Sequence, residues 1–148
     1  MPANRVVAHE KEGRVLKGMT LDFLPKRPVF HLTIAGVEGD RTSEIAVEAL
    51  KALFFVKDFE GNKDYHELKG FSDQPVSGKK VRVTFSDGEE IYGYTHVINY
   101  DQHGFVLVPS DPGCNNERIF VVFSSITDLE VDGRQVYLGN YRRQRWKR

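Results

Sequence analysis

Residues 13–32 read GRVLKGMTLDFLPKRPVFHL, and residues 88–107 read GEEIYGYTHVINYDQHGFVL. The two stretches begin 75 positions apart and carry several identical residues at matching places. The identical pairs include Gly18 and Gly93, Thr20 and Thr95, Phe30 and Phe105, and Leu32 and Leu107. Further along, the offset becomes 76 and apolar positions still match, as Leu53 and Leu129 do. A pattern that returns with a single insertion predicts an internal duplication.

Each copy is predicted to form antiparallel strands. In the second copy, KVRVTF (80–85) alternates apolar and polar residues, which is typical of a half-buried strand. SDGE (86–89) follows it, and its Asp-Gly pair suits a tight hairpin. The next strand, 90–99, is interrupted by Gly93, and a glycine inside a strand pattern suggests a bend. Gly18 is the matching bend of the first copy, and further strands are expected at 104–109, 118–123 and 127–131.

One segment favours a different structure when it is considered alone. SEIAVEALKAL (43–53) contains strong helix formers at helical spacing. Its counterpart, 118–129, is rich in β-branched and aromatic residues and indicates strand, turn and strand. Because two copies of one unit share one structure, we expect a strand at 43–47, a helical turn at 48–51 and a strand at 52–56.

The element pattern resembles the Sm-like family of small barrels, and also SH3-like barrels. GRVLKG (13–18) has two glycines five positions apart, as Sm-like proteins do, followed by a bent strand and an apolar third strand. The resemblance implies a mainly β fold with two tandem five-stranded barrels. Sm proteins also carry an Asp-x-x-Met-Asn pattern that helps to hold a base. Neither copy completes it, so uridine binding is not carried over; the residues at those places are Leu24, Arg27 and Pro28, then Asn99, Gln102 and His103.

The resemblance divides the chain into four parts. These are a first barrel repeat (1–56), a linker (57–78), a second barrel repeat (79–131) and a basic C-terminal tail (132–148). FFVKDFEGN (54–62) and NNERIFVVF (115–123) also resemble a bacterial family of uncharacterised proteins with duplicated barrels.

Composition indicates a folded protein in a reducing compartment. The apolar fraction is 40% and the charged fraction 28%, close to globular averages. The first 13 residues lack the apolar core of a secretory signal, and no apolar run is long enough to span a bilayer. Cys114 is the single cysteine, so an internal disulfide is impossible. We therefore expect a cytoplasmic protein.

The C-terminal tail concentrates positive charge. From Asp132 onward there are six basic side chains and one acidic one, although the whole chain has no net charge. Arginine binds phosphate through its planar fork, and aromatic rings stack on bases. Contact with nucleic acid or a cyclic dinucleotide is therefore one interpretation, and a solubilising tail or a membrane contact are others. The residues concerned are Tyr141, Arg142, Arg143, Arg145, Trp146, Lys147 and Arg148.

No pattern in the sequence predicts catalysis, a cofactor site or a metal site. The five histidines lack metal-ligand spacing, and the chain has no nucleotide-binding glycine motif or GxSxG. Cys114 is expected to be an exposed thiol without a catalytic role, and His31 to lie on the surface. A protein partner is therefore the first expectation, with contacts through loop residues such as Tyr94 and Tyr100. A homo-oligomer built from barrel edges is another interpretation.

Overall fold

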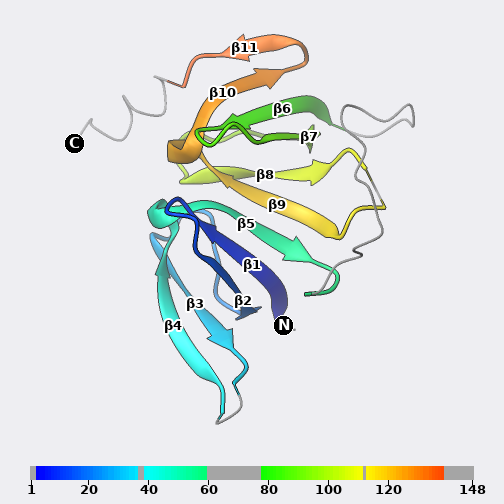
Figure 1. Ribbon diagram of the computed structural model, residues 1–148. Helices are drawn as coiled ribbons and strands as arrows, with labels where there is room; N and C mark the ends of the chain where they lie inside the picture. Colours follow the sequence, from blue (N-terminus) through cyan, green and yellow to red (C-terminus); the bar gives the residue numbers. More distant parts are fainter. Residues whose placement is uncertain (1–2, 37–38, 60–77, 112, 139–148) are drawn as a thin grey trace, which may run out of the picture.

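The computed structural model describes residues 3–36, 39–59, 78–111 and 113–138, and within them the chain is mainly β. All eleven strands belong to one sheet, in which every pairing is antiparallel (Figure 1). The first repeat consists of β1 (Asn4–Glu10), β2 (Val15–Thr20), β3 (Val29–Ile34), β4 (Arg41–Ala46), the 3₁₀ turn η1 (Val47–Ala49) and β5 (Leu50–Val56). The second repeat consists of β6 (Lys79–Phe85), β7 (Glu90–Thr95), β8 (Gly104–Pro109), β9 (Asn116–Val122), η2 (Phe123–Ser125) and β10 (Ile126–Val131), and β11 (Arg134–Val136) follows.

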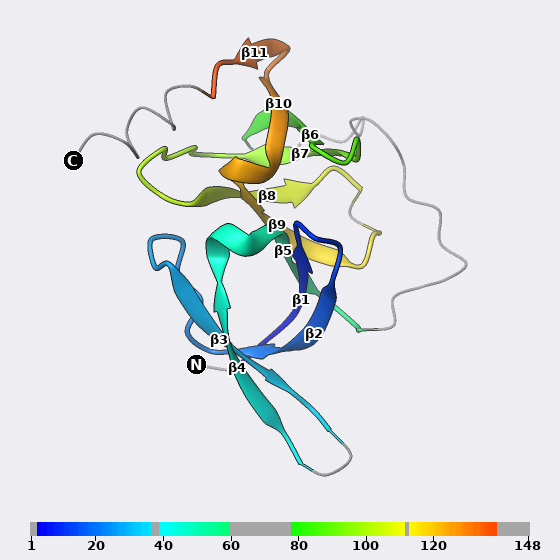
Figure 2. The ribbon, with the colours of Figure 1, turned by 60° about the vertical axis from the view of Figure 1, so that its left-hand side comes forward.

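The strand order is β11-β10-β6-β7-β8-β9-β5-β1-β2-β3-β4, so the sheet is open. Each repeat contributes five neighbouring strands in equivalent order, and the two sets meet where β5 pairs with β9. Figure 2 shows how strongly the first set curls. The prediction of two tandem five-stranded barrels is not confirmed, because the sheet is not closed and β5 uses one edge for β1 and the other for β9.

The two repeats have the same internal registers. Val6 faces Gly18 across β1 and β2, and Val81 faces Gly93 across β6 and β7. The hydrogen bonds before the 3₁₀ turns also repeat: Val47 N–H donates to the Pro28 carbonyl, and Phe123 N–H donates to the His103 carbonyl. The sequence repeat at offsets 75 and 76 is therefore also a repeat of structure.

The ambiguous segment 43–53 forms strand, 3₁₀ turn and strand, as the comparison with the second copy predicted. β4 ends at Ala46, η1 spans Val47–Ala49 and β5 begins at Leu50. The side chains of Val47 and Leu50 are fully buried. Their burial against the core decides the backbone conformation here, because it outweighs the modest helix propensity of this segment.

β5 is apolar along most of its length because both of its faces are buried. Leu53 and Phe55 belong to the core of the first repeat, whereas Ala52, Phe54 and Val56 belong to the core of the second. The run ALFFV thus serves both cores at once, as a strand covered on both faces should. Because β5 is shared in this way, the two repeats pack as one body.

An aromatic side chain from a loop closes the contact between the repeats. Phe23 lies between β2 and β3, and its ring meets those of Phe30 and Phe120 edge to face. Phe30 belongs to the first repeat and Phe120 to the second. Phe23 therefore contributes to internal packing between the repeats. Among the described residues, no helix has the length and apolar character needed to cross a bilayer.

Candidate functional site: the outer face of the first repeat

The residues singled out from the sequence do not come together in one site. The tail residues Tyr141–Arg148 lie outside the described residues. Tyr94 lies inside β7 rather than in a loop, and its side chain is buried. Tyr100 is half-buried in the turn before β8, where its ring stacks on Phe123 at 5.3 Å. Both tyrosines therefore contribute mainly to packing.

Gly18 and Gly93 are required by close packing and not by an unusual backbone angle, since neither has a positive φ. A Cβ on Gly18 would lie 2.5 Å from the Thr33 carbonyl oxygen. A Cβ on Gly93 would lie 2.4 Å from the Val108 carbonyl oxygen. Each glycine thus lets the third strand of its repeat approach the second. The sequence predicted bends at these glycines; the strand pairings run through both without a register shift, and it is the close approach of the third strand that excludes a side chain.

The single cysteine corrects another expectation. Cys114 is buried, and its Sγ lies 3.4 Å from the Asn116 carbonyl oxygen, so the expectation of an exposed thiol is wrong. The turn that contains it folds inward.

Among the described residues, no group of three or more His, Cys, Asp or Glu side chains is placed to hold a metal ion.

Two polar clusters lie where the repeats meet. In the first, the Lys51 ammonium binds Asp87 and Glu89 of the β6–β7 hairpin and lies 4.7 Å from the Phe85 ring centroid. Burial opposes the charged form of Lys51, but its hydrogen bonds with the two carboxylates outweigh this and raise the pKa of Lys51. Glu89 is therefore part of the link between the repeats.

The second cluster joins η1 to η2. The Ser124 hydroxyl donates to Glu48 at 2.9 Å, and the Lys11 ammonium donates to Ser124 and to the Glu48 carbonyl. Burial lowers the pKa of Lys11. His103 Nδ1 lies 3.2 Å from the other Glu48 oxygen. A nucleophilic serine needs a base that takes its proton. Here the hydroxyl is committed to a carboxylate, and the cluster joins the two repeats.

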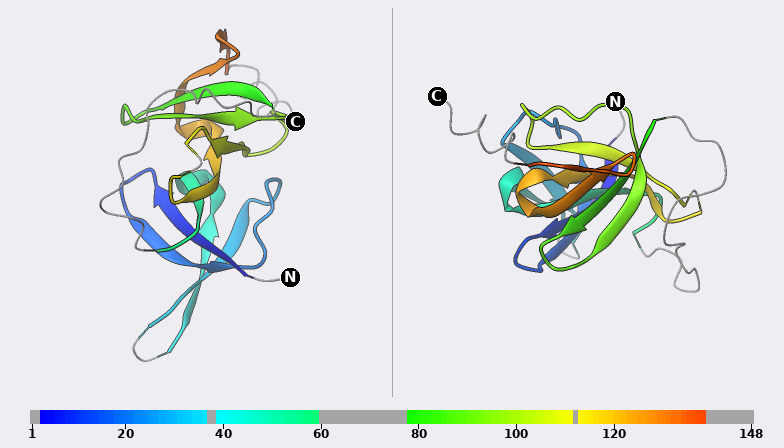
Figure 3. Two further views of the ribbon diagram at one scale, coloured as in Figure 1. Left: turned by 90° about the vertical axis from the view of Figure 1, so that its right-hand side faces the viewer. Right: turned by 90° about the horizontal axis from the view of Figure 1, so that it is seen from above.

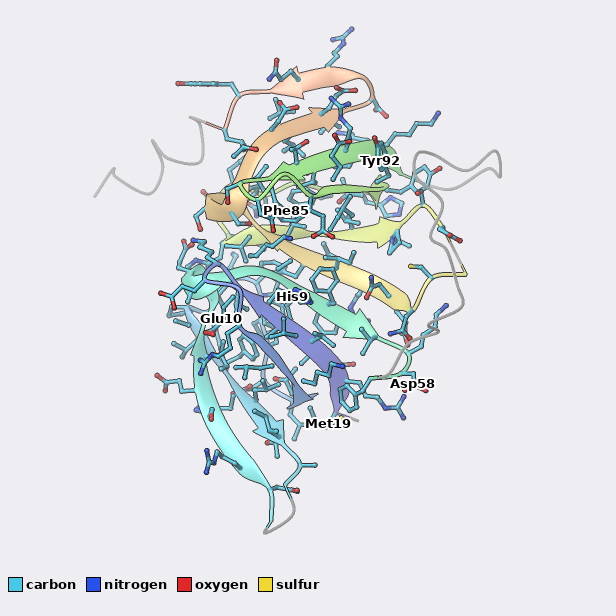
Figure 4. The ribbon with its side chains drawn as sticks, in the orientation of Figure 1. His9, Glu10, Met19, Asp58, Phe85 and Tyr92 are labelled. Carbon is cyan, nitrogen blue, oxygen red and sulfur yellow. The ribbon has the colours of Figure 1, made fainter. Side chains whose placement is uncertain are left out.

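The outer face of the first repeat carries a hollow that is lined mainly by apolar surface. It has a volume of about 410 Å³, within the range of ligand pockets. We call it the outer hollow; it is lined by Ala3, Met19, Leu21, Asp22, His31 and Thr33. Leu21 is 72% exposed at its rim. Figure 4 shows Met19 on β2 near the start of the chain.

A polar pair forms one wall of the outer hollow. The Asp22 carboxylate accepts hydrogen bonds from the His31 backbone N–H at 2.8 Å and from the His31 ring at 2.7 Å. These bonds raise the pKa of His31 and lower the pKa of Asp22. Glu44 of β4 lies on the other side of the ring, 3.8 Å from Nε2. The sequence correctly placed His31 on the surface, opposite the buried Phe30.

Strand register places a basic residue beside Met19, which lines the outer hollow. Arg5 on β1 faces Met19 on β2, and Met19 faces Thr33 on β3. Residues directly opposite one another in a sheet point to the same face, so these three side chains form a row. Sequence reasoning missed this row, although strand alternation in 4–10 and 15–20 would have indicated it once the pairing was known.

A second pocket adjoins the outer hollow. We call it the arginine pocket; it has a volume of about 220 Å³ and is lined by Ala3, Asn4, Arg5, Met19, Phe55, Val56, Glu117 and Arg118. Ala3 and Met19 line both cavities. Arg118 comes from β9 of the second repeat, and its guanidinium lies over the Phe55 ring at 4.1 Å. The pairing of β5 with β9 therefore builds a surface to which both repeats contribute.

A family of unknown function, DUF6982, matches residues 2–133 of the chain. The chain belongs to this family. The match covers both repeats and extends through β10. No curated protein and no solved structure matches the chain.

Proposed function

We propose that this DUF6982 protein is a non-catalytic binding and regulatory adaptor whose partner is another protein. The observation that carries the proposal is the outer hollow, an apolar-lined cavity with an Asp22–His31 pair on its wall. Apolar cavities with a few convergent polar groups are the usual form of binding sites. The apolar lining suits an aliphatic or aromatic side chain, and the polar pair offers a hydrogen-bonding wall.

A free strand edge beside the outer hollow supports the same proposal. Among the described strands, β4 pairs only with β3 and ends the sheet. Figure 3 shows the β3–β4 hairpin extending beyond the body of the protein. An extended segment of a partner can add to such an edge through main-chain hydrogen bonds. Glu44 and Thr42 of β4 contact His31 and Thr33, so the edge and the outer hollow are continuous.

Site-specific photocrosslinking tests the proposal. A photoreactive phenylalanine analogue replaces Leu21 at the rim of the outer hollow or, as a control, Val97 of the second repeat. Both residues are 72% exposed, so the two positions have the same solvent accessibility. In extracts of cells that express the protein, we expect one discrete adduct from position 21 and none from position 97. Met19→Asp in the same chain should remove the adduct. Equal adducts from both positions, or none from position 21, would refute the proposal.

The five strands of each repeat also suggest a fold family for the single repeat. We propose that each set of five strands is an Sm-like or SH3-like unit and that the two units arose by internal duplication. The equivalent strand orders β5-β1-β2-β3-β4 and β10-β6-β7-β8-β9 support this, as do the equivalent registers. Each unit alone would be small, and a shared core compensates for the area that a short chain cannot bury.

The second candidate function is binding of nucleic acid or a nucleotide through the basic tail. Six basic side chains follow residue 131, and Tyr141 and Trp146 stand among them. The described residues that lead into the tail include an exposed Arg134 and an exposed Tyr137. Fluorescence anisotropy of the full chain and of residues 1–131, with labelled RNA and DNA, separates this candidate from the first.

Salt dependence is the readout that decides the second candidate. If the tail neutralises about five phosphates of a single strand, log K should fall with log salt at a slope near −3.5. A fourfold rise in salt should then weaken binding by roughly a hundredfold. Equal binding by the truncated chain, or no binding at low salt, would exclude the tail as a nucleic-acid site.

A further inference from the structure

The arginine pocket holds two cations from different repeats that lack a carboxylate partner. Among the described residues, neither Arg5 nor Arg118 has a carboxylate oxygen within 4.0 Å, although Glu117 also lines the pocket. By contrast, Arg14 and Arg82 are both engaged in ion pairs. Arginine keeps its charge at all ordinary pH values, so the pocket carries two permanent positive charges.

The internal contacts of the two arginines leave most of their donors available. Arg5 gives one N–H to the Lys57 carbonyl at 2.6 Å, and a guanidinium has five. The Arg118 guanidinium lies over the Phe55 ring, and this contact does not use its N–H groups. Each guanidinium therefore keeps N–H groups that can donate to a carboxylate oxygen, and charge-assisted hydrogen bonds of this kind are strong.

We propose that the arginine pocket binds an acidic side chain or terminal carboxylate of a protein partner whose neighbouring apolar side chain fills the outer hollow. The inference rests on the proposed function, because it specifies the chemistry of the segment that the outer hollow accepts. The two cavities share Ala3 and Met19, so one short segment can reach both. Only the pairing of β5 with β9 brings Arg118 to this place. A partner segment in this pocket therefore contacts both repeats.

Nuclear magnetic resonance with short peptides tests the inference. The probes are acetylated, amidated peptides Leu-Gly-Glu and Leu-Gly-Gln, which differ only in the charge of the last side chain. The Met19 methyl signal reports on the outer hollow, and the Arg5 and Arg118 Nε–H signals report on the arginine pocket. The chain has only two methionines, so the methyl signal is simple to assign. We expect the glutamate peptide to move both sets of signals and to bind roughly tenfold more tightly than the glutamine peptide.

Variants assign the preference to the two arginines. Arg5→Gln and Arg118→Gln should each reduce the preference for glutamate, and the double variant should abolish it while the Met19 methyl still responds. Arg134→Gln is the matched control, because Arg134 is an exposed arginine on β11, at the far end of the sheet. Arg118→Gln also changes the packing on Phe55. Arg118→Lys is therefore made as a second variant, because it keeps the positive charge and loses only the planar guanidinium that can bind both carboxylate oxygens.

The outcomes separate this inference from the proposed function. Equal binding of the two peptides, with a Met19 response, would overturn the arginine inference and leave the outer hollow as a protein site. No Met19 response to either peptide at millimolar concentration would count against both. Inorganic phosphate and a dithymidine dinucleotide serve as further probes. Arginine shifts with these probes that match or exceed those with the glutamate peptide would overturn the inference and indicate a phosphate-bearing ligand.

Discussion

The Lys51 ammonium of β5 lies 2.7 Å from the Asp87 carboxylate in the β6–β7 hairpin, so one ion pair ties the first repeat to the second. The Lys51 side chain is 12% exposed, whereas the carboxylates that it binds are more than 40% exposed. Lys51 is thus the inner member of the cluster. The stability of the contact between the two repeats therefore depends on these charges as well as on apolar packing.

Replacing Lys51 by methionine should keep the packing over Phe85 and remove the ion pairs. We expect the free energy of unfolding at pH 7 to fall by about 1 kcal/mol, because partly exposed ion pairs contribute at this level. The hydrogen bond from Lys51 lowers the pKa of Asp87. The contribution of the Lys51–Asp87 ion pair to stability is therefore fully present above the pKa of Asp87 in the unfolded chain. It is lost as the pH falls through the lowered pKa of Asp87 in the folded protein. Urea denaturation should show the deficit at pH 7, and the deficit should shrink as the pH falls below the lowered pKa of Asp87.

Lys79→Met is the control for the Lys51 substitution, since Lys79 is exposed at the start of β6. It should leave the stability unchanged within about 0.5 kcal/mol. A Lys51→Met deficit that persists undiminished in acid would show that lost packing, and not the carboxylates, causes the change.

Gly104→Ala should destabilise the protein although it adds a single methyl group. A Cβ at position 104 would lie 1.9 Å from the Val121 carbonyl oxygen, so β8 and β9 would have to separate. Overpacking of this kind costs about 1–3 kcal/mol or more. Val29 occupies the equivalent place in the first repeat, opposite Ala46, and its side chain is accommodated there. Val29→Ala is therefore the matched control, and thermal denaturation should show a much larger loss for Gly104→Ala.

Gly93→Val should unfold or severely destabilise the protein. Its side chain would collide with the Val108 carbonyl oxygen and with Leu107, which is fully buried. Circular dichroism melting should show a large fall in Tm, whereas Tyr92→Val, one residue earlier on β7, should change Tm by only a few degrees. An unchanged Tm for Gly93→Val would mean that β7 and β8 are not packed as closely as described.

His31 should titrate at a higher pH than an isolated histidine. The hydrogen bond to Asp22 raises its pKa, so the stabilisation is present below the unfolded pKa near 6.5 and is lost as pH rises through the folded value. Asp22, whose pKa is lowered, contributes above its own unfolded value. The pair should therefore stabilise the loop most between these limits. Proton resonances of the His31 ring give the midpoint directly.

Two substitutions identify the cause of the His31 shift. Asp22→Asn should return the His31 midpoint towards 6.5, because the charged hydrogen-bond partner is gone. Glu44→Gln should lower the midpoint much less, since Glu44 lies 3.8 Å from the ring and is not within hydrogen-bond distance. A larger effect from Glu44→Gln than from Asp22→Asn would contradict the assignment of Asp22 as the main partner.

The sequence predicted the local elements well because their signals are local. Alternation in 80–85 and the Asp-Gly turn that follows it require no distant contact, and they form β6 and its hairpin. Comparison between the copies also resolved segment 43–53, where propensity alone favours a helix. The burial of Cys114 and the role of Glu89 could not be predicted, because each depends on a surface supplied by another part of the chain.

The candidate site was less accessible to sequence reasoning. Asp22 and His31 are nine positions apart and meet only because β2 and β3 pair as a hairpin. Arg5 and Arg118 are far apart in the sequence and line one pocket because β1 and β9 flank β5 on opposite sides. No periodicity connects such residues, so a list of motifs could not have joined them.

By itself, the sequence determined a mainly β chain and a repeat at offsets of 75 and 76. These follow from side-chain alternation, turn residues and matched apolar positions, which act over short distances. Only the tertiary structure decided that β5 pairs with β9, that the sheet stays open, and that the outer hollow adjoins a pocket with an arginine from each repeat. Strand alternation shows which faces are apolar. It does not show which edge a strand gives to which neighbour, because every backbone can make the same edge hydrogen bonds.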